Sequence, residues 1–153
     1  MHFRLILVGR TERGHVTEGF AHYADRIARA ATFSTVVVPE AGKGDPAFKS
    51  KWEGERILAA LLPGEVFVAL DERGKSMTSV AFANQLGKWR DGGRQRVAFV
   101  VGGAYGLSEP VRERADLLLS LSPMTFPHQL VRVLFAEQLY RSLSILKGSP
   151  YHH

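Results

Sequence analysis

A glycine-rich stretch in the last third of the chain has the composition of a ligand-binding loop. It runs from Gly102 to Leu107, reads Gly-Gly-Ala-Tyr-Gly-Leu, and follows an apolar segment that ends at Val101. Glycines let a backbone approach a ligand closely, and a helix that starts after the loop, at Ser108, offers free N–H groups. The loop is neither G-x-G-x-x-G nor a phosphate loop, because it has no lysine to meet a phosphate. The same residues also fit a tight turn between a strand and a helix.

A second stretch, Ser122 to Phe126, is unusual because no charged residue occurs between Leu117 and Pro127. An uncharged loop suits a slot for a flat and largely neutral ring that is bound through backbone groups. Adenosine fits this description, whereas a triphosphate does not. The alternative is a buried connection packed by Met124 and Phe126.

These loops must be positioned by the elements around them, which alternate between strand and helix patterns. Apolar and β-branched runs predict strands at 3–9, 33–38, 65–70, 95–101 and 116–121. Helical spacing of apolar residues, together with capping residues, predicts helices at 16–31, 47–62, 78–89 and 127–147, and a short one that begins at 109. Residues 71–77 are predicted to form a polar loop. The pattern predicts a single domain over residues 1–153, of the α/β class, with a parallel sheet flanked by helices.

Three of the predicted strands end at Leu70, Val101 and Leu121, next to the unusual loops. In open α/β sheets, ligands bind outside the carboxyl ends of the strands. We therefore expect the glycine loop and the uncharged loop to face one pocket. The final helix is apolar over more than half of its circumference, which predicts burial or a subunit contact and makes a homodimer plausible. On this helix Glu137 and Arg141 have the i, i+4 spacing of an ion pair.

The composition excludes several kinds of site and favours one kind of partner. The chain has no cysteine, which excludes disulfides and thiolate catalysis, and none of its six histidines belongs to a paired i, i+4 ligand motif, so we expect no metal. The net charge of +5 favours a polyanion such as nucleic acid. No apolar run is long enough to cross a membrane, and the start does not resemble a signal peptide, so we expect a cytoplasmic protein. A modest basic patch that would suit backbone phosphates, or would be only a turn between a helix and a strand, consists of Lys88, Arg90, Arg94 and Arg96.

Four motifs, taken in order, resemble one known family. They are Gly-Gly-Ala-Tyr-Gly-Leu-Ser at 102–108, Met-Thr-Phe-Pro-His-Gln-Leu-Val-Arg-Val at 124–133, Glu-Gln-Leu-Tyr-Arg at 137–141 and Pro-Tyr-His at 150–152. Together they resemble the family of ribosomal RNA large-subunit methyltransferase H (RlmH) in the SPOUT superfamily, and the resemblance covers essentially the whole chain. It implies an α/β fold with a deep C-terminal trefoil knot and a homodimer.

The resemblance also implies an activity and a cofactor pocket. The activity is transfer of a methyl group from S-adenosyl-L-methionine to N3 of a pseudouridine in 23S rRNA, on assembled ribosomes. The resemblance places the cofactor against the same three strand ends that the loop compositions indicate. The implied cofactor-binding residues are Leu70, Gly102, Gly103, Leu121, Ser122, Pro123, Met124, Thr125 and Phe126.

Methylation of the imide N3 requires loss of its proton, so a base or a positive group should lie near that atom. His128 could position or deprotonate the base, or it could be an exposed residue at a helix start. Arg132 could hold a phosphate or a uracil carbonyl, or it could form an ordinary salt bridge. Tyr151 and His152 lie in a tail, Gly148–His153, that spans roughly 20 Å when extended and could reach a neighbouring pocket across a dimer interface. The alternative for the tail is a frayed terminus.

Two further functions stay open on the sequence alone. The chain could be a ribosome-binding factor that kept the fold and lost turnover, or a SPOUT enzyme that methylates another RNA such as a tRNA. Binding of S-adenosylmethionine would separate the first from an enzyme, and assays on tRNA, free rRNA and ribosomes would separate the second.

Overall fold

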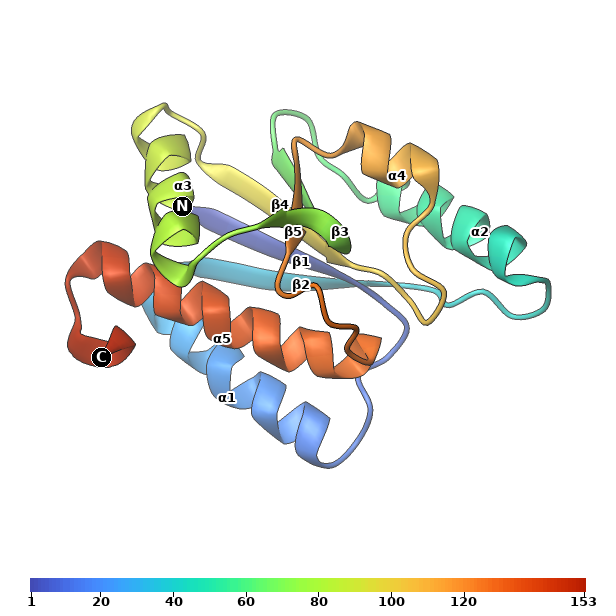
Figure 1. Ribbon diagram of the computed structural model, residues 1–153, viewed down its shortest axis with the longest axis horizontal. Helices are drawn as coiled ribbons and strands as arrows, with labels where there is room; N and C mark the ends of the chain where they lie inside the picture. The colour runs from blue at the N-terminus through green and yellow to red at the C-terminus, as the bar shows by residue number, and fades with distance from the viewer.

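A computed structural model describes residues 1–153 as one five-stranded parallel sheet with the strand order β2-β1-β4-β3-β5. The strands are β1 (His2–Val8), β2 (Thr32–Val38), β3 (Val66–Ser76), β4 (Arg96–Val101) and β5 (Leu117–Ser120). The helices are α1 (His15–Ala30), α2 (Pro46–Ala59), α3 (Ser79–Asp91), α4 (Glu109–Arg114), α5 (His128–Lys147) and the short 3₁₀ helix η1 (Pro150–His152). The predicted α/β class is confirmed, with α1, α3 and α5 on one face of the sheet and α2 and α4 on the other (Figure 1).

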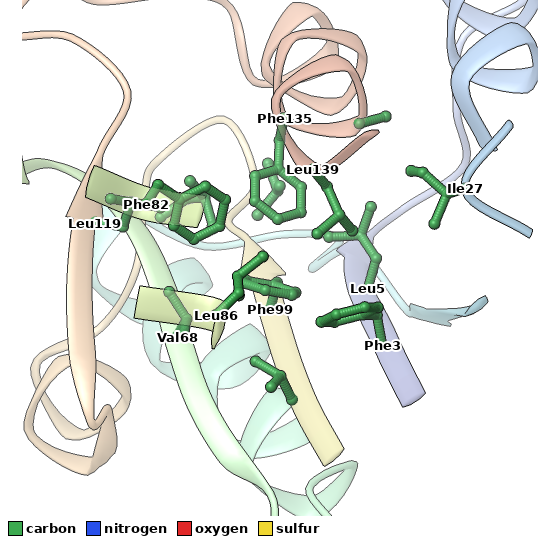
Figure 2. Close-up of a cluster of buried hydrophobic side chains, with 14 of the residues drawn as sticks. Phe3, Leu5, Ile27, Val68, Phe82, Leu86, Phe99, Leu119, Phe135 and Leu139 are labelled. Atoms are coloured by element: carbon green, nitrogen blue, oxygen red, sulfur yellow. The ribbon is translucent and has the colours of Figure 1, made fainter. Parts of the chain in front are cut away.

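The face under α1, α3 and α5 holds the larger hydrophobic core. Figure 2 shows Phe82 of α3 and Phe135 of α5 turned toward Phe99 of the central strand β4. The ring centroids of Phe99 and Phe135 are 4.7 Å apart, and those of Phe82 and Phe99 are 6.2 Å apart. On the opposite face, Ile57 of α2 and Val111 of α4 pack on alternate residues of the same strands. Because both faces are covered, the strands read as continuous apolar runs.

Helices α1 and α5 run in the same direction across their face of the sheet, and α3 lies against the second half of α5 at a steep angle to it (Figure 1). Gly19 of α1 packs against Val133 of α5, and nearer the other end Arg26 lies over the ring of Tyr140. For α3, Ser79 Oγ donates to Gln138 Oε1 at 2.6 Å, and Gly87 packs against Leu146. The last turns of α1 and α5 therefore lie together at one end of the molecule, away from the carboxyl ends of the strands.

Strand β3 continues to Ser76, so the prediction of a polar loop at 71–77 is wrong for most of its length. Up to Leu70 the strand is hydrogen-bonded to β4 on one side and β5 on the other. Beyond that point it pairs only with β5, where Lys75 faces Leu119 after a shift in register. One edge is then open to solvent, which explains the polar sequence. Gly74 permits the pairing, because a Cβ there would lie 2.6 Å from the backbone of Leu118.

The predicted helix ends are mostly confirmed. Thr78 caps α3 by accepting the N–H of Ala81 at 3.0 Å, and Gly148 ends α5 with a φ of 78°. Ser108 stands at the N-cap of α4, but its side chain makes no capping hydrogen bond and packs instead against Gly54 of α2. None of the helices combines the length and the apolar character that a membrane span requires.

Candidate functional site

A cavity of about 710 Å³ lies at the carboxyl ends of β4 and β5 and beside residues 70–73 of β3, where the sequence predicts a pocket. The two predicted loops both contribute to its wall. The predicted cofactor-binding residues that line it are Leu70, Gly102, Gly103, Leu121, Ser122, Met124, Thr125 and Phe126. Pro123 is the one predicted residue that is not part of the lining. A volume of this size suits a cofactor-sized small molecule, for which pockets of about 300–1,000 Å³ are usual.

The glycine loop is both a tight turn and a wall of the cavity. Gly106 donates its N–H to the carbonyl of Gly103 at 3.0 Å, which closes the turn, and its φ of 79° favours glycine. Behind the loop, a Cβ on Gly103 would lie 2.8 Å from Oε1 of Glu53, a buried carboxylate on α2. The other oxygen of Glu53 accepts the N–H of Ala41 at 2.9 Å. The loop backbone thus lies against a fixed support and presents its other side to the cavity.

The uncharged loop is held by its own hydroxyl groups. Ser120 Oγ donates to the carbonyl of Ser122 at 2.9 Å, and Ser122 Oγ accepts the N–H of Met124 at 3.0 Å. The interpretation as a buried connection is wrong for Met124, whose exposed fraction is 74%, whereas Phe126 is half-buried. Thr125 Oγ1 donates to Glu72 Oε2 at 2.6 Å and so connects this loop to the extended part of β3.

The sequence pattern did not indicate the charged side chains at the rim of the cavity, which come from the extension of β3 and from α4. Asp71 lies 3.4 Å from Nη1 of Arg112, which also donates to the carbonyl of Leu107 at 2.5 Å. Burial alone would raise the pKa of Asp71, but the hydrogen bonds and charge of Arg73, with the charge of Arg112, lower it overall. The rim therefore carries a carboxylate that stays ionised and a guanidinium that is fixed in place.

His128 lines the cavity, half-buried in the first turn of α5. Arg132, one turn later, does not. Its side chain is fully buried and donates to the carbonyls of Val8 at 2.6 Å and Gly9 at 3.0 Å, and to Thr11 Oγ1 at 2.9 Å. The alternative salt bridge is absent, because the guanidinium holds the end of β1 against α5. Burial accordingly lowers the pKa of Arg132. The negative charges of Glu12 and Glu40 offset part of this lowering.

The tail is folded rather than frayed, and it packs on its own helix α5. The ring of Tyr151 meets that of Tyr140 edge to face with centroids 4.7 Å apart, and its hydroxyl donates to Glu137 Oε1 at 3.2 Å. The predicted pair of Glu137 and Arg141 is confirmed at 2.5 Å, and Arg141 Nη1 lies 3.3 Å from Nδ1 of His152. Burial raises the pKa of Tyr151 to about 12, helped by Tyr23 and Glu137. Tyr151 and His152 do not line the cavity of their own chain.

Comparison with known proteins decides the family. The family described as "Predicted SPOUT methyltransferase" matches residues 1–152. A "Ribosomal RNA large subunit methyltransferase H" from Rhodospirillum centenum is 46% identical over 152 residues, which cover 99% of each chain. A protein of the same name from Bacteroides thetaiotaomicron is 43% identical over 97% of each chain. The chain belongs to the SPOUT methyltransferase family. The resemblance seen in the sequence is thereby confirmed.

Solved structures show the same fold. The SPOUT chain is similar to the SpoU methyltransferase AviRb from Streptomyces viridochromogenes, solved in complex with AdoMet, with a TM-score of 0.52 and 16% identity. That match covers 97% of this chain and 59% of AviRb. A probable methylase family protein from Haemophilus influenzae has a TM-score of 0.52 at 10% identity, over 95% of this chain and 66% of the other. The trefoil knot implied by the resemblance stays a prediction.

Proposed function

We propose that this chain transfers the methyl group of S-adenosylmethionine to N3 of a pseudouridine in 23S rRNA, on assembled ribosomes in the cytoplasm. The observation that carries the proposal is the cavity that the glycine loop and the uncharged loop share at the strand ends. The names of the relatives support an rRNA substrate, and the AdoMet bound to AviRb supports the cofactor.

The lining of the cavity fits the two chemically different ends of this cofactor. The uncharged loop and the backbone of Gly102 and Gly103 would hold the neutral adenosine. The methionine end carries an ammonium and a carboxylate, for which the rim offers partners of both signs in Asp71 and Arg112. The cofactor supplies the electrophilic methyl group. The protein contributes orientation, which brings the target nitrogen into line with that methyl group.

Among the predicted catalytic residues, His128 is the one that lines the cavity. It lines the wall at the start of α5, so its imidazole is available to orient the target base or to accept the N3 proton. Arg132 is committed to the end of β1 and is assigned to structure instead. With a pKa of about 12, Tyr151 is a neutral phenol at physiological pH and would act as a hydrogen-bond donor rather than as a base.

The position of the tail favours a homodimer in which two chains complete each site. Tyr151 and His152 pack on α5 beside Glu137 and Arg141, away from their own cavity. Those two residues of α5 line a second cavity of about 560 Å³, bounded by α1, α3 and α5 and by part of the uncharged loop. An apolar and polar cavity with a folded tail beside it suits a copy of the same chain. The tail of one copy would then approach the first cavity of the other.

Transfer of tritium from labelled cofactor to 70S ribosomes, followed by nucleoside mapping, tests the proposal. We expect label in N3-methylpseudouridine of 23S rRNA, less label in free rRNA and none in tRNA. Label that appears in tRNA instead would make the chain a SPOUT enzyme with another target. Calorimetry that shows no binding at millimolar cofactor would make it a ribosome-binding factor without turnover.

A further inference from the structure

A cleft of about 530 Å³ lies at the end of α5 opposite to the cofactor cavity. It is formed between the last turns of α1 and α5 and the start of the tail, which lie side by side (Figure 1). Three cationic side chains line it: Arg26, Arg29 and Lys147. The rest of the lining is mainly small or polar, including Ser144 and Ser149, so the cleft does not resemble an apolar docking groove.

The three cations have no carboxylate partner. None of them lies within 4 Å of an acidic oxygen, although the chain forms six such ion pairs elsewhere. Asp25, which neighbours Arg26 on α1, forms no ion pair, and Glu137 is bound to Arg141. The guanidinium of Arg26 is instead held over the ring of Tyr140, 5.6 Å from its centroid, which fixes a positive charge at the cleft.

Helix capping does not account for these cations. The carbonyls of Ile145 and Ser144, at the end of α5, already accept the N–H groups of Gly148 and Ser149 at 3.1 and 2.9 Å. At the end of α1, the carbonyl of Ile27 accepts the N–H of Ala31 at 2.9 Å. The remaining favourable effect on a cation is that of the helix dipole, which is small at an exposed site. Three unpaired charges facing one cavity therefore indicate an anionic ligand.

We propose that this cleft binds phosphodiester groups of the RNA backbone. Arginine forms paired hydrogen bonds with phosphate oxygens, and lysine binds them as a point charge. Ser149 adds a hydroxyl donor, because its Oγ only accepts a bond, from the N–H of Tyr151 at 3.4 Å. The inference rests on the proposed function for the identity of the polyanion as RNA, and it assigns a second contact to that RNA.

The distance between the cleft and the cofactor cavity determines which step a phosphate bound in the cleft can affect. They lie at opposite ends of α5, whose 20 residues correspond to about 30 Å. A phosphate in the cleft is therefore remote from the cavity of the same chain, and it lies at the base of the tail that carries Tyr151 and His152. Contacts of this kind fix the register of an RNA and add affinity without reading its sequence. We expect the cleft to change RNA binding and to leave cofactor binding unchanged.

The basic patch predicted from the sequence is a matched control. Lys88, Arg94 and Arg96 are exposed around the turn between α3 and β4, and they line none of the described cavities. The patch also contains Arg90, which pairs with Asp91 at 2.9 Å. Removal of three charges from the patch changes the net charge as much as removal of three from the cleft. A difference in ribosome binding between the two variants then measures the contribution of the cleft and not the effect of the overall charge.

The test compares R26Q/R29Q/K147Q with K88Q/R94Q/R96Q in cosedimentation with 70S ribosomes over a range of KCl concentrations. The cleft variant should bind at least about tenfold more weakly, and its log–log salt slope should fall by about 0.7–0.9 for each phosphate that it no longer neutralises. The patch variant should show smaller reductions in both affinity and slope. Calorimetry should give the same cofactor affinity for both variants and the wild type. A double variant R26K/R29K, which keeps the charge, should keep the salt slope.

A cleft variant that binds ribosomes with wild-type affinity and slope would overturn the inference. So would a patch variant whose affinity and slope fall as much as those of the cleft variant. Wild-type protein that binds ribosomes but transfers no methyl group would refute the proposed function and leave the cleft intact. Wild-type protein that does not bind ribosomes at any salt concentration would refute both. Thermal unfolding of each variant checks that the fold is retained.

Discussion

The two ends of helix α5 are built for different ligands. At the His128 end, the cavity is walled mainly by backbone and uncharged side chains, with Asp71 and Arg112 at its rim, and the nearby Arg132 makes its hydrogen bonds inside the protein. At the Lys147 end, three cations line a cleft without carboxylate partners, and a folded tail lies beside them. A neutral ring and a phosphate backbone need these two environments, so one helix separates the cofactor from the proposed contact with the RNA backbone.

The cations at the two ends of α5 also differ in what they contribute, because one stabilises the fold and the others are available to a ligand. A buried cation with internal acceptors holds the fold together, whereas an exposed cation with no partner contributes little to the free energy of unfolding. Substitutions at both ends of the helix test that distinction, first at the end with the largest expected effect.

Arg132→Met should give the largest loss of stability. The substitution leaves the carbonyls of Val8 and Gly9 and the hydroxyl of Thr11 without their donor. Each unpaired buried group costs about 1–3 kcal/mol, so the free energy of unfolding should fall by at least about 3 kcal/mol in urea titrations. Arg141→Met, on the same helix but half-exposed, should cost about 1 kcal/mol or less. Equal losses for the two variants would contradict the assigned roles.

Gly102→Val should weaken cofactor binding strongly and stability little. A Cβ on Gly102 would lie 3.0 Å from Leu107 Cδ2, so the loop must shift at the wall of the cavity. We expect calorimetry to show a loss of affinity of about tenfold or more, which corresponds to about 1.4 kcal/mol. Gly42→Val is the matched control, because no atom lies within 4 Å of a Cβ at that position. Unchanged affinity in Gly102→Val would show that the cofactor does not use this wall.

Tyr151→Phe should give a smaller, pH-dependent effect at the tail. Its pKa is raised from 10 to about 12, so the protonated phenol is the favoured form in the folded chain. Its stabilising contribution is therefore fully present below pH 10 and is lost as the pH rises through about 12. Wild type should be more stable than Tyr151→Phe by about 0.5–1.5 kcal/mol at pH 8, and the difference should shrink above pH 10. A constant difference between pH 8 and 12 would contradict the contact with Glu137.

Thr125→Val should have the smallest effect. The variant removes the exposed hydrogen bond to Glu72 that connects the uncharged loop to β3. Stability should change by less than about 1 kcal/mol, and the rate of cofactor dissociation should rise modestly in stopped-flow measurements. Glu72→Gln keeps an acceptor and should leave the rate close to that of the wild type. A faster rate in Glu72→Gln alone would mean that the charge of Glu72, and not the bond, holds the loop.

The sequence predicted the elements and the pocket better than the side chains around it. The five strands were predicted because parallel strands covered on both faces are continuous apolar runs, as Phe3–Val8 shows. The extension of β3 was missed because its pairing beyond Leu70 depends on one distant partner strand and leaves polar residues on an open edge. The rim residue Asp71 was missed for the same reason, whereas Arg112 reaches the rim from α4 through its contact with Asp71.

The burial of Arg132 could not be predicted from the sequence either. An arginine one turn from a candidate catalytic residue looks the same whether it faces solvent or the carbonyls of a neighbouring strand end. The basic cleft depends on two helices, α1 and α5, that are about a hundred residues apart in the chain and parallel in space. Periodicity identifies the faces of each helix, but it does not show which last turns come together.

The most direct test of the account is methyl transfer to 70S ribosomes by mixed dimers. One chain carries Gly102→Val, which damages the cavity, and the other lacks Pro150–His153, which removes Tyr151 and His152. Two different affinity tags allow the mixed dimers to be purified and their formation to be verified. With the cofactor held below its wild-type Kd, the account predicts that each variant alone shows little activity and that the mixed dimer regains activity, because one intact cavity meets one intact tail. A purified mixed dimer with no activity, or a tail-deleted chain with full activity, would contradict it.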